Sequence, residues 1–200
     1  MENGNIYLNK VGQSVTIRQA HECDELYGIV EKKFLTEYKT KPATLRALLF
    51  GSETQHSSPR LFVVASEGEL VGYVITFDFF QATYITTLNI IKEKQCQGYG
   101  SMLLEYVCND PNRTYILITE VAMSDSELLS DCMRRKLFYL RNGFRAVPIK
   151  WRCEEYYRYD VHIKGPDQEL GSLLAVLRKG EEIWRTAEIS LLRNQGMEEG

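Results

Sequence analysis

The chain has 200 residues, of which 44% are hydrophobic, and a formal net charge of −3. These values fit one domain with a substantial core, and no basic stripe indicates nucleic-acid binding. No apolar run reaches the roughly 20 residues that span a membrane, and the N-terminus lacks the apolar core of a signal peptide. We therefore expect a cytoplasmic protein with neither nucleic acid nor membrane as a partner.

The cysteines and histidines do not form a recognisable framework. The five cysteines are scattered without a CxxC pair, and the three histidines stand far apart. This pattern favours neither a metal site nor structural disulfides. We therefore expect no metal and reduced thiols.

The N-terminal part predicts a strand, two helices and a loop. Alternating apolar residues predict a strand over Ser14–Ala20. Residues 21–37 carry apolar side chains at helical spacing, and Pro42 suits the first turn of a short helix that runs to Phe50. Residues 51–59 are polar and rich in turn formers.

Four strands are then expected around one helix. Residues 61–66 and 70–79 flank the turn Glu67-Gly68-Glu69 and predict an antiparallel hairpin. Residues 84–91 are a third strand, and the apolar run 115–121 is typical of a strand covered on both faces. A helix that starts near Gly98 connects these two strands, which favours parallel neighbours.

The C-terminal part predicts helices around a further pair of strands. A helix through Asn142 ends at Gly143, and strands follow at 144–149 and 156–163. Two short helices split at Gly180 are expected after Pro166. The preferred division is a domain of residues 1–165 with a helical extension, residues 166–200, packed on it. In the helix before Gly143, one stripe is expected to face the core: Leu129, Met133, Leu137 and Leu140.

The segment between the strand at 84–91 and the next helix predicts an anion site. Glycines at a strand–turn–helix corner place several free N–H groups and a positive helix end around one point. Gln95, Gly98 and Gly100 fit neither GxGxxG nor the P-loop spacing. They do fit (Arg/Gln)-x-x-Gly-x-(Gly/Ala), which resembles the acyl-coenzyme A pyrophosphate loop of the GNAT N-acetyltransferase superfamily.

A second pattern, Phe138-Tyr139-x-x-x-Gly143-Phe144, resembles the signature that closes the cofactor site in the same superfamily. The resemblance covers roughly residues 15–161, and its specific part is residues 84–144. It implies an α/β (α+β) fold, with a mixed, mainly antiparallel central sheet flanked by helices. Two central parallel strands would splay apart.

The resemblance also implies a binding site for acetyl-coenzyme A as acyl donor. Pantetheine would lie in the split beside Leu88, Asn89 and Ile90, and Cys132 replaces an asparagine that contacts the cofactor in many members. The pyrophosphate loop would comprise Gln95, Cys96, Gln97, Gly98, Tyr99, Gly100 and Ser101.

The implied reaction is direct attack of a neutral amine on the thioester. A backbone N–H such as that of Ile90 would stabilise the oxyanion, and Tyr139 matches the position of the general acid that protonates sulfur. Glu120 is the best candidate for the base, directly or through water, against the alternative of a solvated strand-end glutamate. Cys96 has no acid–base partner nearby in sequence, so a covalent enzyme intermediate is not expected.

The leading hypothesis is therefore an enzyme, an acetyl-coenzyme A-dependent N-acetyltransferase that acts on a primary amine. The alternative is a non-catalytic acyl-coenzyme A-binding sensor or interaction module, and a third interpretation is an α/β domain with accidental motifs. Acidic residues, among them Asp125 and Asp131, mildly favour a cationic acceptor. The acceptor, a homodimer and the role of residues 166–200 stay open.

Overall fold

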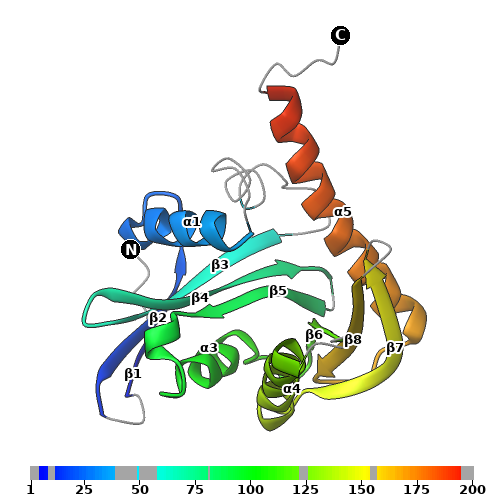
Figure 1. Cartoon of the computed structure of the whole chain (residues 1–200), viewed down its shortest axis with the longest axis horizontal. Helices are drawn as coiled ribbons and strands as arrows, with labels where there is room; N and C mark the ends of the chain where they lie inside the picture. Colours follow the sequence, from blue (N-terminus) through cyan, green and yellow to red (C-terminus); the bar gives the residue numbers. More distant parts are fainter. Residues whose placement is uncertain are drawn as a thin grey trace.

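In the computed structural model, the described residues are 5–8, 12–38, 49, 58–80, 82–121, 126–153 and 157–194. They form one eight-stranded sheet in the order β1-β2-β3-β4-β5-β6-β8-β7, in which only the β5–β6 pair is parallel. Helices cover both faces, α1 and α5 on one side and α3 and α4 on the other (Figure 1). The expected fold class, mixed and mainly antiparallel, is confirmed.

The strands and helices have the following bounds. The strands are β1 Asn5–Leu8, β2 Ser14–Ala20, β3 Ser58–Ser66, β4 Glu69–Asp78, β5 Ala82–Ile90, β6 Thr114–Glu120, β7 Arg145–Cys153 and β8 Tyr157–Lys164. The helices are α1 Glu25–Tyr38, the 3-10 turn η1 Lys92–Lys94, α3 Tyr99–Val107, α4 Ser126–Arg141 and α5 Leu170–Asn194. Strand β1 is absent from the sequence-based expectations, and the predicted helix over residues 42–50 lies outside the described residues except for Leu49.

The β3–β4 hairpin has the turn that its sequence predicts. Glu67 and Gly68 both have positive φ, at 54° and 82°. Two left-handed central residues match the right-handed twist of the flanking strands in a two-residue hairpin. The predicted hairpin is therefore confirmed, although β3 begins three residues earlier than expected and β4 covers residues 69–78 instead of 70–79, so that Glu69 belongs to the strand.

Strands β5 and β6 start together and then part. Their parallel ladder is limited to Ala82–Tyr84 against Thr114–Ile116, whereas the other edge of β5 pairs with β4 as far as Ile90. Beyond Tyr84, the β6-facing edge of β5 has no strand partner among the described residues. The predicted split between two central parallel strands is present.

Arg113, just before β6, holds the paired ends of these strands together. Its Nε donates to the Thr83 hydroxyl at 2.6 Å. Its Nη2 donates to the carbonyls of Phe79 and Ala82, at 2.6 and 3.0 Å. One partly buried guanidinium thus ties the β4–β5 connection to the start of β6.

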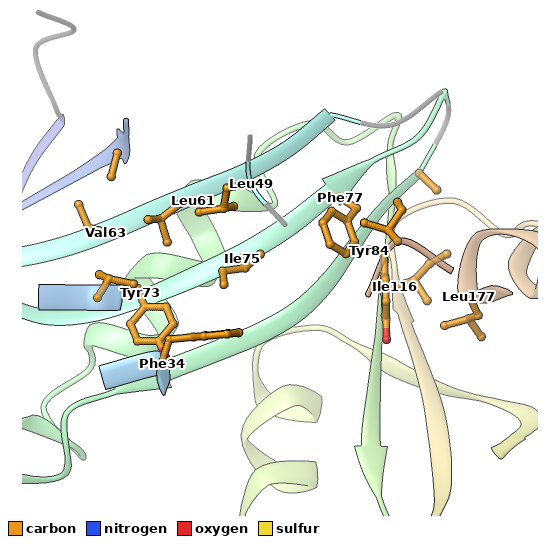
Figure 2. Packing of buried hydrophobic residues seen from close by; sticks show 14 of the residues in the cluster. Phe34, Leu49, Leu61, Val63, Tyr73, Ile75, Phe77, Tyr84, Ile116 and Leu177 are labelled. Atoms are coloured by element: carbon orange, nitrogen blue, oxygen red, sulfur yellow. The ribbon is translucent and has the colours of Figure 1, made fainter. Parts of the chain in front are cut away.

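The larger core cluster lies on the face covered by α1 and α5. Phe34 of α1 packs with Tyr73 and Ile75 of the sheet, while Leu177 of α5 lies near Ile116 (Figure 2). The second cluster lies under α3 and includes Phe144, which follows α4. The sheet is therefore a shared wall between two apolar layers.

Helix α5 is one continuous helix, so the predicted split at Gly180 is wrong. A Cβ at Gly180 would lie 2.5 Å from Cδ1 of Tyr84. The glycine thus allows α5 to pass close to the ring of a core tyrosine, and tertiary packing outweighs its poor helix propensity. The C-terminal half of α5 extends beyond the sheet (Figure 1).

The predicted core-facing stripe of α4 is also wrong. Leu129, Met133, Leu137 and Leu140 are 51, 49, 44 and 41% exposed. The residues that pack inward are Cys132, Phe138 and Tyr139, because α4 presents these side chains toward the sheet and the space beside β5. Helical periodicity identifies an apolar stripe but does not tell which side of the helix meets the sheet.

No helix in the part of the chain that the structure describes is both long and apolar enough to cross a membrane.

The close approach at Gly180 gives a stability prediction. Gly180→Ala should lower the melting temperature although alanine is the better helix former, because the added methyl group meets the Tyr84 ring. Overpacking of this kind lowers the free energy of unfolding by about 1–3 kcal/mol. In a chain of this size, each kcal/mol lowers the melting temperature by roughly 2–4 °C. The melting temperature is measured by thermal unfolding followed by circular dichroism.

Gly171→Ala is the matched control, because a Cβ at Gly171 in the same helix meets nothing within 4 Å. It should leave the melting temperature unchanged or raise it slightly. Equal effects of the two substitutions would contradict the close packing of α5 on Tyr84.

Candidate functional site

A cavity of about 700 Å³ opens beside the unpaired edge of β5. The residues that line it come from the end of β5, the segment that leads into α3, the first turn of α3 and the inner side of α4. They are Leu88, Asn89, Ile90, Lys94, Gln95, Cys96, Gly98, Tyr99, Gly100, Ser101, Asp131, Arg134, Arg135, Phe138, Tyr139, Arg141 and Asn142. Its volume is typical of a site for a small molecule or cofactor.

The segment from Gln95 to Gly98 brings the start of α3 to this cavity. The Gln95 side chain donates to the Ile90 carbonyl at 3.0 Å, which ties the loop to the end of β5. Cys96 and Gly98 have left-handed backbone, with φ of 62° and 93°. Within the described residues, no side chain caps α3 at Gly98, and Gly100 and Ser101 of its first turn line the cavity. The start of a helix favours an anion.

Gly100 allows α3 and α4 to approach each other. A Cβ at this position would lie 3.0 Å from Cζ of Phe138. The glycine and the aromatic residue of the two sequence patterns therefore meet in space, 38 residues apart in the sequence.

Tyr139 both packs in the core and lines the cavity. Its ring makes edge contacts with Phe138 and Phe144, with centroid distances of 5.2 and 5.9 Å. The Phe144 N–H donates to the Tyr139 carbonyl at 3.1 Å, and Gly143 has φ of 84° in the turn between them. The second sequence pattern therefore fixes the orientation of the tyrosine ring at the cavity wall.

Three of the predicted site residues do not line the cavity. Gln97 donates back to the Glu93 carbonyl at 3.4 Å. Cys132 is buried beneath Arg135, whose Nη2 contacts its Sγ at 3.6 Å. Glu120, at the end of β6, accepts a hydrogen bond from the same Nη2 at 2.9 Å.

Arg135 therefore connects Glu120, Cys132 and the cavity. Burial by itself would lower the pKa of its guanidinium, but the Glu120 carboxylate and the Cys132 thiol outweigh burial, so the pKa is raised. Arg135 is a permanent cation in the cavity wall.

The cavity wall carries a surplus of positive charge that the sequence patterns do not reveal. Lys94, Arg134, Arg135 and Arg141 line it, against the single acidic residue Asp131, which pairs with Arg134 at 3.1 Å. In the sequence, Arg134 and Arg135 precede the second pattern and Arg141 lies within it, but which arginines face inward depends on the orientation of α4. Such a wall favours a ligand with several negative charges.

No group of histidine, cysteine and acidic residues among the described residues has an arrangement that could hold a metal ion.

Comparison with known proteins identifies the fold. The acetyltransferase (GNAT) domain family model matches residues 57–146, and no curated protein matches the sequence. A GNAT-family protein from Bacteroides thetaiotaomicron superposes with a TM-score of 0.60 at 16% identity, covering 82% of this chain and 94% of the other. A GNAT-family protein from Desulfovibrio desulfuricans gives 0.56 at 13% identity, covering 76 and 98%.

A third similar structure is an aminoglycoside 6′-N-acetyltransferase in complex with coenzyme A, with a TM-score of 0.55 at 14% identity, covering 76% of this chain and 99% of the other. The matched segment, residues 57–146, contains the split strands, the glycine loop and α4. The chain thus has the GNAT fold, and its residues 57–146 match the acetyltransferase (GNAT) domain model.

Proposed function

We propose that the protein is an acetyl-coenzyme A-dependent N-acetyltransferase that acts on a primary amine. The main support for this proposal is the cavity beside the split of β5 and β6. The start of α3, which has no side-chain cap among the described residues, forms part of its wall. The coenzyme A complex of a structural neighbour supports the choice of donor. A cytoplasmic location, a homodimer and the division at residue 165 stay predictions.

The cavity fits the chemical groups of coenzyme A. The N–H groups at the start of α3 suit the pyrophosphate, and Arg141, Lys94 and Arg134 supply further positive charge to the phosphates. The edge of β5 at Leu88–Ile90, which no described strand covers on the β6 side, offers backbone groups to the amide-containing pantetheine arm. When bound, the thioester supplies an activated acetyl carbonyl.

The proposed transfer needs two proton movements. The amine nitrogen forms a bond to the carbonyl carbon, the carbon–sulfur bond breaks, and its electron pair goes to sulfur. The Tyr139 hydroxyl gives sulfur its proton, so that coenzyme A leaves as a thiol. The amine gives a proton to Glu120, directly or through water, and no covalent enzyme intermediate is needed.

Tyr139 favours the catalytic proposal over a non-catalytic acyl-coenzyme A sensor. Its ring is anchored by two aromatic neighbours and lies at the cavity wall. A sensor would need the loop and the cations but not an ionisable hydroxyl at this place.

Calorimetric titration tests the cofactor site. The protein should bind acetyl-coenzyme A selectively over NAD and ATP, and Gly100→Val should weaken this binding by tenfold or more. The added side chain meets Phe138 and forces α3 and α4 apart. Gly171→Val is the control for a β-branched residue in a helix, since its site is open. Absence of selective binding in folded protein would refute the proposed cofactor.

The phosphate contacts have their own test. Arg141→Gln should weaken acetyl-coenzyme A binding by about 5- to 20-fold, because one charge-assisted contact is lost, and the remaining affinity should depend less on salt. Arg178→Gln, in an exposed position of α5, should leave the dissociation constant unchanged. The same dissociation constant for both variants would exclude Arg141 from the phosphate site.

The role of Tyr139 is separable from its packing. Tyr139→Phe keeps the ring contacts, so the dissociation constant for acetyl-coenzyme A should stay within about twofold of the parent value. With an amine that the parent enzyme acetylates, kcat should fall about 10²- to 10⁴-fold, the range for a lost general acid. Thiol release gives the rate, and a parent-like kcat would refute the general-acid role.

A further inference from the structure

The ion pair between Arg135 and Glu120 lies across the strand split from the Leu88 end of the cavity. Tyr84 of β5 pairs with Ile116 of β6. Parallel strands advance about 3.3 Å per residue, so Leu88 and Glu120, each four residues further on, reach the same level. The pair therefore lies across the split from Leu88, at the rim of the cavity that Arg135 lines.

Both charged groups of this pair can be reached by a ligand. The side chains of Arg135 and Glu120 are 50 and 45% exposed, and Arg135 lines the cavity. Both hydrogen bonds of Arg135, to Glu120 and to the Cys132 sulfur, come from the same Nη2. Its Nε and Nη1 donate to no group among the described residues, and can therefore donate to a ligand.

Arg135 is distinct from the cations assigned to the phosphates. Successive residues of an α-helix point about 100° apart, and Arg134 pairs with Asp131 rather than with Glu120. Arg135 alone among these cations is held beside the end of β6.

We infer that the acceptor is an amine with a carboxylate next to its amino group, such as a free α-amino acid. This inference rests on the proposed function and specifies its acceptor. Glu120 receives the amino group, and the remaining N–H donors of Arg135 receive the carboxylate. A glutamate alone would suit any cationic amine, whereas adjacent charges of both signs, 2.9 Å apart, match the neighbouring charges of a zwitterion.

Matched pairs of acceptors test this inference. The acceptors are the free amino acids that occur in proteins. Each is compared, where available, with the amine that lacks its carboxylate. Examples are phenylalanine with 2-phenylethylamine and leucine with 3-methylbutylamine. Thiol release from acetyl-coenzyme A gives kcat/KM. At least one amino acid should exceed its matched amine by about 10- to 100-fold, the range for one hydrogen-bonded charge.

Substitution of the arginine should then remove the preference. In Arg135→Met, the ratio of kcat/KM for that amino acid to kcat/KM for the matched amine should fall about 10- to 100-fold, because any effect through Glu120 is common to both acceptors. Arg178→Met, remote from the cavity on α5, should keep the parent ratio. The dissociation constant for acetyl-coenzyme A, measured by calorimetry, should stay within about threefold in Arg178→Met; any change in Arg135→Met affects both acceptors alike and leaves the ratio of their kcat/KM values unaffected.

Three results would overturn the inference. The first is acetylation of simple amines with no amino acid acetylated, and the second is an amino-acid preference that survives in Arg135→Met. The third is acetyl-coenzyme A binding without turnover of any amino acid. If the protein does not bind acetyl-coenzyme A at all, the proposed function itself is wrong. The inference about the acceptor, which rests on that function, is then wrong as well.

Discussion

The short parallel ladder between β5 and β6 is the constraint on which the site depends. Backbone pairing joins these strands over Ala82–Tyr84 and Thr114–Ile116 and stops there. Arg113 fastens the joined ends by donating to Thr83, Phe79 and Ala82. Because β4 supports the other edge of β5 to its end, the strands can separate without leaving β5 unsupported. The separation exposes one edge of a central strand inside the molecule, which is the geometry that a ligand with amide groups can complete.

Helix α4 turns this split into a chemically defined cavity. Its inner side supplies the aromatic pair Phe138 and Tyr139, of which Phe138 meets Gly100 of α3 and Tyr139 meets Phe144. The same helix contributes Arg134, Arg135 and Arg141 to the wall. Shape and charge therefore come from one element, and its outer side is left with four half-exposed apolar residues. A helix that builds a polar cavity has fewer apolar side chains to bury against the sheet.

The side chains in and beside the cavity offer two kinds of chemistry. The start of α3 and Arg141 suit the proposed phosphates, whereas the ion pair of Arg135 and Glu120, across the split from Leu88, presents both signs of charge. The carboxylate proposed to take the proton of the amine is therefore held by the arginine proposed to bind the carboxylate of the acceptor.

Local chemistry in the sequence was sufficient to predict the hairpin at Glu67-Gly68, the strand–loop–helix around Gly98 and Gly100, and the turn after α4 at Gly143. In each case the backbone conformation is set by the residues that adopt it, as the positive φ values show. Ten of the predicted cofactor and catalytic residues line one cavity because the two patterns that contain them meet at Phe138 and Gly100. The inward side of α4, the continuity of α5 across Gly180 and the pairing of Arg135 with Glu120 could not be predicted in this way. They depend on contacts between segments distant in the chain, such as Gly180 with Tyr84, and only tertiary packing decides which apolar stripe is buried and which charges become neighbours.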